Sequence, residues 1–166
     1  MAKDKRLGRK TVRDLVPDDL SVRDLKATTK EEAIAELLNV LVIGGVLDLD
    51  RERGVLESIL EREKVASTGI GNGIAIPHAK NKFATRFAVA AGLSAEGIEF
   101  GSHDDMPVFV VVLWVCPPSA TPEHLALMRG IALVARDANM AGTLSAARDK
   151  RGFLAVLEKV AVEEKK

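Results

Sequence analysis

The sequence predicts a single α/β domain in which a β-sheet lies between layers of helices. Segments with strand character alternate along the chain with longer segments of helical apolar spacing, and no linker or repeat divides them. The segment Val108–Val115 is β-branched and aromatic with almost no polar interruption, which is typical of a central strand covered on both faces. A length of 166 residues fits one domain with a substantial core.

The first half of the chain begins with a predicted strand near Leu20–Leu25. A helix is expected to start at Thr28 or Thr29, because a glutamate follows each threonine three residues later in the capping-box pattern. The pair Gly44-Gly45 ends this helix. Its apolar stripe follows the i, i+3, i+4, i+7 spacing and consists of Ile34, Leu37, Leu38 and Leu41.

A second helix is expected from about Asp50 to Glu63. Its inward face is predicted to consist of Leu56, Ile59 and Leu60. A loop with glycines at positions 69, 71 and 73 follows, and then a short apolar strand, Ile74–Ile76. Pro77 and His78 come directly after this strand, so the histidine is expected at a strand end beside a glycine-rich loop.

The second half of the chain adds two strands and three helices. Arg86–Ser94 has strand character, and Pro117-Pro118 stops the central strand described above. Thr121-Pro122 is expected to open the third helix, with the threonine as N-cap and the proline as first helical residue. Shorter helices are expected near Met140–Arg148 and over about Lys150–Val162. The predicted buried face of the third helix consists of Leu127, Met128, Ile131, Val134 and Ala135.

The charge balance bears on the class of partner. The 24 lysine and arginine residues equal the 24 aspartate and glutamate residues in number, which gives no support for nucleic acid or a membrane surface as partner. A basic run near the N-terminus is better explained as a solvated chain end. It consists of Lys3, Lys5, Arg6, Arg9 and Lys10. We expect flexible tails at 1–11 and 163–166 around a domain that spans 12–162.

The remaining composition indicates a cytoplasmic protein without a membrane-inserted segment. A single cysteine, Cys116, excludes an internal disulfide and suits a reducing compartment. The longest apolar run, Val108–Cys116, is too short to cross a bilayer as a helix, and the charged N-terminus has no apolar signal region. Three histidines and one cysteine offer no metal-ligand spacing, so we expect no metal.

His78 is the candidate nucleophile. Imidazole titrates near neutral pH, so a neutral ring has a nitrogen available for attack. The glycines before it allow backbone N–H groups to approach an anion closely. This combination suggests phosphoryl chemistry. The alternative is a strand-end histidine that is merely held by hydrogen bonds.

A family resemblance favours the phosphoryl interpretation. It is carried by Ser67–Lys80, which reads Ser-Thr-Gly-Ile-Gly-Asn-Gly-Ile-Ala-Ile-Pro-His-Ala-Lys. This segment resembles the phosphorylation-site signature of the IIA proteins of the bacterial phosphoenolpyruvate-dependent sugar phosphotransferase system (PTS), fructose/mannitol class (EIIA type 2), and looks closest to the nitrogen-regulatory branch. Ala79 departs from the glycine that is frequent there. The resemblance runs from about Val12 to Val160, and it implies a mixed sheet with helices on both sides.

Two further residues match family positions. His124 lies in the first turn of the third helix, where the helix N-terminus favours a phosphate, and it begins the pattern His-Leu-x-x-Met-x-x-Ile-Ala. The resemblance implies that His124 binds the phosphoryl group or orients His78. Arg62 matches a family arginine, and a guanidinium can grip phosphate oxygens with two parallel bonds. The alternatives are a core histidine and an ordinary surface arginine.

Backbone N–H groups of the glycine loop are weaker candidates for phosphate binding. They are those of Thr68, Gly69, Asn72 and Gly73. The loop is not a dinucleotide fingerprint, because a strand follows it where that motif has a helix. The same residues can also serve only to turn the chain. His103 matches no functional family position and is expected in a solvated loop.

The resemblance implies a phosphocarrier that receives phosphate on His78 from the histidine protein HPr and needs no cofactor. In the first hypothesis phosphorylation regulates a target protein, as in the nitrogen branch. In the second the chain passes phosphate to a IIB domain during fructose- or mannitol-type uptake. In the third it is a protein-binding module that is never phosphorylated. Which ring nitrogen of His78 reacts depends on the partner of the other nitrogen.

Overall fold

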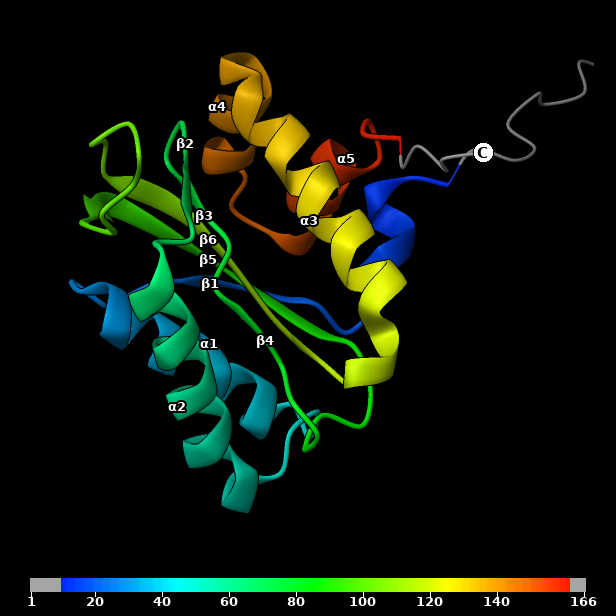
Figure 1. Cartoon of the computed structure of the whole chain (residues 1–166). Helices are drawn as coiled ribbons and strands as arrows, with labels where there is room; N and C mark the ends of the chain where they lie inside the picture. The colour runs from blue at the N-terminus through cyan, green and yellow to red at the C-terminus, as the bar shows by residue number, and fades with distance from the viewer. Residues whose placement is uncertain (1–9, 162–166) are drawn as a thin grey trace, which may run out of the picture.

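The computed structural model describes residues 10–161 (Figure 1). The predicted C-terminal tail, Val162 and most of the basic N-terminal run lie outside this range. Thr11, the last residue of the predicted N-terminal tail, lies within the described range and forms an antiparallel bridge with Ala161. The two ends of the described chain therefore meet on one side of the domain.

A mixed six-stranded sheet forms the centre of the fold, in the order β1-β5-β6-β3-β2. The remaining strand, β4, pairs with β6 on the same side as β3 but further along β6. The strands β3 and β4 run parallel to β6, whereas β5 is antiparallel to it and parallel to β1. The strands are β1 (Ser21–Asp24), β2 (Gly69–Gly71), β3 (Ile74–Ala75), β4 (His78–Lys80), β5 (Ala88–Ile98) and β6 (Val108–Cys116). The predicted α/β class and the mixed sheet are confirmed.

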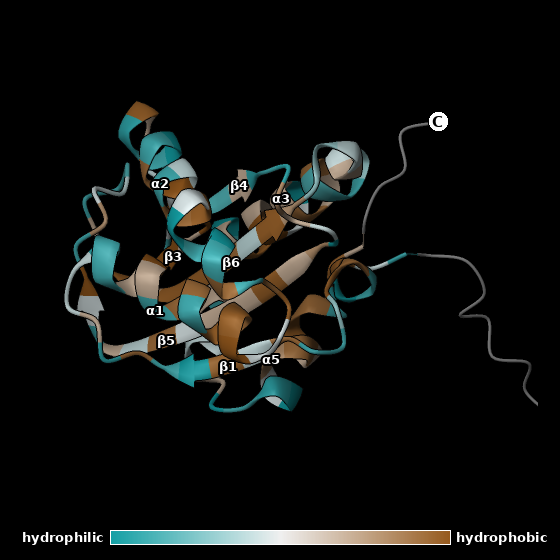
Figure 2. Ribbon diagram, turned by 90° about the horizontal axis from the view of Figure 1, so that it is seen from below, coloured by the Kyte–Doolittle hydropathy of each residue, from teal (hydrophilic) through white to brown (hydrophobic). Residues whose placement is uncertain are grey.

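Helices cover both faces of this sheet. Figure 1 shows α1 and α2 on one face and α3, α4 and α5 on the other, and Figure 2 shows hydrophobic residues gathered along the sheet and the helix faces turned toward it. The helices are α1 (Lys30–Ile43), α2 (Leu49–Val65), α3 (Thr121–Arg136), α4 (Ala138–Ala146) and α5 (Lys150–Leu157), with 3-10 turns η1 (Val12–Leu15) and η2 (Pro118–Ala120).

The start of α1 follows from local sequence. Thr29 is the N-cap: its hydroxyl accepts a hydrogen bond from the backbone N–H of Glu32, whose carboxylate accepts one from the Thr29 backbone N–H. The helix ends at Ile43 with Gly44 as its C-cap, as the glycine pair predicts, and Gly45 then adopts a positive φ of 70°. Both signals require only neighbouring residues, so they can be read from sequence.

Four predictions of local structure need correction. Thr121 is the first residue of α3 and not its N-cap, because η2 runs directly into the helix and the Thr121 hydroxyl donates to the Pro118 carbonyl. The glycine segment is not a loop, since Gly69–Gly71 forms β2, a hairpin partner of β3. The helix α5 stops at Leu157, short of Val162. The strand predicted to end at Ser94 extends to Ile98 as part of β5.

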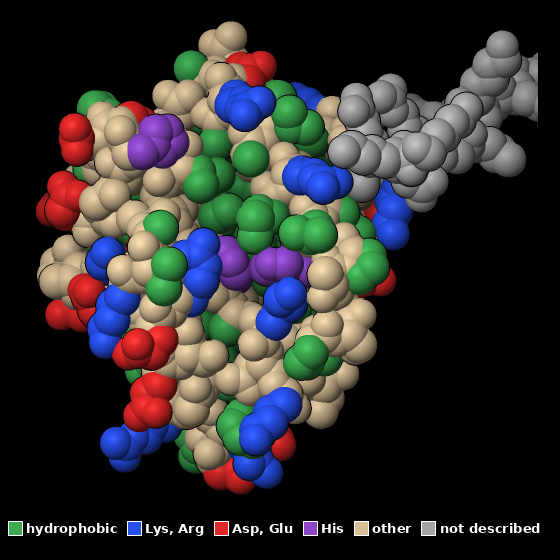
Figure 3. Space-filling model, viewed as in Figure 1, with side chains coloured by type: hydrophobic (Ala, Val, Ile, Leu, Met, Phe, Trp, Pro, Cys, Tyr) green, Lys and Arg blue, Asp and Glu red, His purple; other side chains and the backbone are tan. Residues whose placement is uncertain are grey.

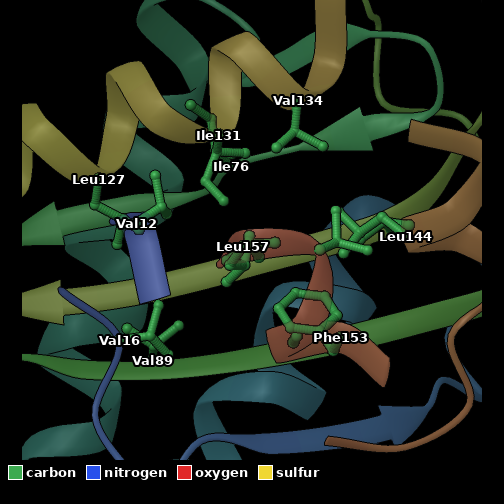
Figure 4. Packing of buried hydrophobic residues seen from close by; sticks show 14 of the residues in the cluster. Val12, Val16, Ile76, Val89, Leu127, Ile131, Val134, Leu144, Phe153 and Leu157 are labelled. Atoms are coloured by element: carbon green, nitrogen blue, oxygen red, sulfur yellow. The ribbon is translucent and has the colours of Figure 1, made fainter. Parts of the chain in front are cut away.

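The side chains of β6 point alternately to the two faces of the sheet and so contribute to two separate hydrophobic clusters. Val110, Val112 and Trp114 face α3, α4 and α5, whereas the residues between them face α1 and α2. All residues of β6 are buried except Phe109, so both sheet faces are covered as predicted. Figure 4 shows Leu127, Ile131 and Val134 of α3 pointing toward the sheet.

The helix faces agree with prediction in part. On α3, four of the five predicted residues are buried and Met128 is half-buried. On α2, Ile59 is buried and Leu56 and Leu60 are half-buried, while Val55 and Glu63 are buried without having been predicted. Within residues 10–161, no helix is long and apolar enough to cross a membrane.

Substitution of two helical glycines tests the packing of η1 against α3. An alanine at buried position 130 would place its Cβ against the Cγ2 atom of Val12, whereas a Cβ at exposed Gly142 meets nothing. Alanine favours a helix by about 1 kcal/mol over glycine, and overpacking costs about 1–3 kcal/mol. We therefore expect Gly130→Ala to lower the free energy of unfolding and Gly142→Ala to raise it. Urea denaturation of both variants measures this, and a stabilised Gly130→Ala protein would contradict the packing described.

Candidate functional site

The candidate site is built around a stacked pair of rings. In the parallel ladder of β4 and β6, His78 is the register partner of Trp114. Their side chains leave the sheet on the same face, and the rings stack with centroids 5.0 Å apart and planes at 11°. The indole is fully buried and His78 is 6% exposed, so the imidazole has one face on the core and an edge at the surface.

One hydrogen bond fixes the tautomer of His78. Its Nδ1 lies 2.7 Å from the backbone carbonyl oxygen of Ile76. A carbonyl oxygen only accepts, so Nδ1 carries the proton and Nε2 of the neutral ring carries the lone pair. Burial lowers the pKa of His78, aided by the nearby charges of Arg62 and Lys80 against the opposing effects of Ile76 and Glu63. The lowered pKa favours the neutral ring, in which Nε2 carries the lone pair.

His124 lies beside this pair, buried in the first turn of α3. Its ring centroid is 4.9 Å from that of His78, and its Nδ1 accepts a hydrogen bond of 2.9 Å from Nε1 of Trp114. Burial lowers the pKa of His124 to about 4, with smaller contributions from His78, Lys80 and Arg62. The structure thus brings together the two histidines that the sequence singled out.

A surface depression of about 420 Å³ opens over these rings. Its lining contains two cations and no carboxylate. Figure 3 shows the central histidine side chains below an apolar patch, with basic side chains beside them. The lining residues are Ser58, Arg62, His78, Ala79, Lys80, His124 and Met128. Such a lining favours an anion.

The two cations reach the depression from different elements. Arg62 comes from the last turn of α2, where its Nη1 donates to the Ala66 carbonyl. Lys80 ends β4, and its Nζ lies 3.5 Å from the hydroxyl oxygen of Thr121. Sequence reasoning missed Lys80, although its position two residues after His78 in a strand places both on one face.

A buried carboxylate anchors the end of α2 that carries Arg62. Glu63 is 5% exposed and accepts hydrogen bonds from the backbone N–H and the hydroxyl of Thr68. Lys30 of α1 lies 3.6 Å from the same carboxylate. These contacts tie α2 to the start of β2, so the backbone next to Arg62 is fixed.

The backbone N–H groups predicted to bind phosphate belong to residues that do not line the depression. The backbone N–H of Thr68 donates to Glu63 and that of Gly69 donates to the Ser67 hydroxyl, so both are already engaged. Gly69 is required for another reason, since a Cβ there would overlap the side chain of Ser102. Neither residue lines the depression.

Asn72 and Gly73 lie still further away, at the hairpin turn between β2 and β3, where both have positive φ. The Asn72 amide donates to the carbonyl of Ala135 in the last turn of α3, at the opposite end of that helix from His124. Its backbone N–H donates to the carboxylate of Asp104, so both donor groups of Asn72 already have partners within the protein. None of these four residues lines the depression.

The remaining arrangement can accept a phosphoryl group. It offers a neutral ring nitrogen with a lone pair, an adjacent imidazole, and two cations to balance negative charge. His103 is exposed in the loop beside the hairpin turn and takes no part in the depression. No group of three or more potential metal ligands occurs within residues 10–161.

Known sequences resemble the chain over most of its length. A "Nitrogen regulatory protein" of Bradyrhizobium diazoefficiens is 36% identical over 147 residues, covering 88% of this chain and 94% of that protein. A "PTS system fructose-specific EIIA component" of Haloferax volcanii is 38% identical over 117 residues, covering 70% and 75% respectively.

Solved structures of related proteins resemble the fold. The crystal structure of nitrogen regulatory protein IIA-Ntr from Neisseria meningitidis matches with a TM-score of 0.77 at 25% identity, over 88% of this chain and 98% of that one. The family model described as "Phosphoenolpyruvate-dependent sugar phosphotransferase system, EIIA 2" matches residues 14–160. With its relatives in sequence and in fold agreeing, the chain belongs to the EIIA type-2 family of the phosphoenolpyruvate-dependent sugar phosphotransferase system.

Proposed function

We propose that this protein is a phosphocarrier that accepts a phosphoryl group on Nε2 of His78 from a phosphorylated HPr-type protein. The observation that carries the proposal is the hydrogen bond from Nδ1 to the Ile76 carbonyl, which leaves Nε2 unprotonated. His78 also lines a depression without carboxylates, where an incoming phosphoryl group meets no like charge. Membership of a family of phosphotransfer intermediates supports this role.

The transfer needs little covalent work from the protein. The Nε2 lone pair of His78 attacks the phosphorus atom of the donor phosphohistidine in line, and the donor's P–N bond breaks with its electron pair returning to the donor ring. The product ring of His78 keeps its Nδ1 proton and so becomes cationic. The Ile76 carbonyl already accepts a hydrogen bond from this N–H group, so it stabilises the positive charge without moving.

The other residues of the depression have separate roles in the proposal. Arg62 and Lys80 balance the charge of the phosphoryl oxygens, and the planar guanidinium can bind two of them at once. His124 donates a hydrogen bond to a phosphoryl oxygen from its ring. None of these contacts requires the backbone N–H groups of Thr68, Gly69, Asn72 or Gly73.

We favour a regulatory role over a sugar-specific one. The Bradyrhizobium nitrogen regulatory protein corresponds to the chain over almost all of both lengths, whereas the Haloferax fructose-specific component matches a shorter part. In this role the new negative charge on His78 changes which target protein the face around the depression can bind. In the alternative role the phosphoryl group passes to a IIB domain.

Replacement of the acceptor tests the proposal. After incubation with phosphoenolpyruvate, enzyme I and HPr, intact-mass spectrometry should find one acid-labile phosphoryl group on the parent protein and none on His78→Ala. His103→Ala is the matched control, because His103 lies outside the depression, and it should be phosphorylated fully. Retained phosphorylation of His78→Ala would sink the proposal, and an unmodified parent would favour an unphosphorylated binding module.

Arg62→Ala tests the electrostatic part. A hydrogen bond to a charged group is worth about 1.5–3 kcal/mol, so the rate of phosphoryl acceptance should fall roughly 10- to 100-fold. Arg53→Ala removes an exposed arginine from the opposite end of the same helix and should leave the rate unchanged. Quenched-flow measurement with phospho-HPr compares the two. Equal rates for both variants would show that Arg62 does not contact the phosphoryl group.

A further inference from the structure

Trp114 contacts both histidines of the site, which sets it apart from the other buried residues of β6. Its ring stacks on that of His78, and its Nε1 lies 2.9 Å from Nδ1 of His124. It is the only tryptophan in the chain and is fully buried. It does not itself line the depression, so any effect on chemistry must act through the two imidazoles.

The indole N–H can only donate a hydrogen bond. Nδ1 of His124 must therefore accept, and the single proton of the neutral ring must lie on Nε2. A second proton on Nδ1 would point at the indole N–H, so protonation of His124 requires this buried hydrogen bond to break. One contact thus selects both the tautomer and the charge state of His124.

We propose that Trp114 is a positioning residue that holds His124 as the neutral ring protonated on Nε2, ready to donate a hydrogen bond. The two histidines then have opposite tautomers. His78 is protonated on Nδ1 by its bond to Ile76 and offers a lone pair at Nε2, whereas His124 offers an N–H group from its own Nε2. The nucleophile and the donor to the phosphoryl oxygens are thereby assigned before any phosphate arrives. The role of His124 as donor to the phosphoryl oxygens rests on the proposed function. Its tautomer does not.

The surroundings of His124 also favour its neutral form. The titratable groups that face it are His78 and Lys80 from β4 and Arg62 from α2, and none of them is negatively charged. Together with burial, they lower the pKa of His124 to about 4. These groups disfavour the charged ring but do not distinguish the two neutral tautomers. Only the indole N–H does that.

Because Trp114 is the only tryptophan, a tryptophan-requiring host can replace it alone with β-(3-benzothienyl)alanine. This analogue has sulfur in place of the N–H group and nearly the same shape, so packing is retained and only the donor is lost. Trp114→Phe serves as a second variant without the donor. The measurement is nitrogen-15 NMR of the histidine rings in the unphosphorylated protein, followed over pH.

In the parent protein we expect His124 to be protonated on Nε2 alone and to titrate near its lowered pKa of about 4. In both variants the tautomer protonated on Nδ1 should appear and the titration midpoint should rise, while His78 stays protonated on Nδ1. A parent His124 protonated on Nδ1, or a benzothienyl protein with unchanged tautomer and midpoint, would overturn the proposal.

The second readout is phosphoryl acceptance from phospho-HPr. Loss of one neutral hydrogen bond should slow it about fivefold in the benzothienyl protein. An unchanged rate would show that His124 does not use its Nε2 proton in transfer. If the parent protein accepted no phosphate, the proposed function would fail, whereas the NMR result would still decide the tautomer.

Discussion

The hydrogen bond between Nδ1 of His78 and the Ile76 carbonyl is the contact on which the proposed chemistry depends. It exists because the regular strand pairing is interrupted between β3 and β4. Ile76 and Pro77 lie in that gap, so the Ile76 carbonyl is free to accept from a side chain, while the Pro77 carbonyl accepts from the backbone N–H of Trp114. The break in the ladder thus holds the histidine and selects its reactive nitrogen.

The alternation of β6 builds the rest of the site. A strand buried on both faces has to place an apolar side chain on each face in turn, and Trp114 falls on the face covered by α3. The same face carries His78 on β4 and receives His124 from the first turn of α3. The histidines are therefore supported by the core itself, and rotation of either ring would disturb buried contacts.

Residues whose role depends on near neighbours could be predicted, and those that depend on distant partners could not. The capping box of α1 is local, and the family resemblance singled out both histidines and Arg62. The backbone N–H of Asn72, predicted as a phosphate donor, donates instead to Asp104, which only the fold brings near. The sequence predicts Trp114 only as part of a buried central strand, because its bond to His124 joins that strand to a helix.

The most direct test of the central claim is the nitrogen to which phosphorus becomes attached. Nitrogen-15 and phosphorus-31 NMR of the phosphorylated protein, labelled in its histidine rings, measures the coupling between the two nuclei. The structure predicts coupling to Nε2 of His78, with Nδ1 still protonated against the Ile76 carbonyl. Coupling to Nδ1, or to a ring nitrogen of another histidine, would contradict the account.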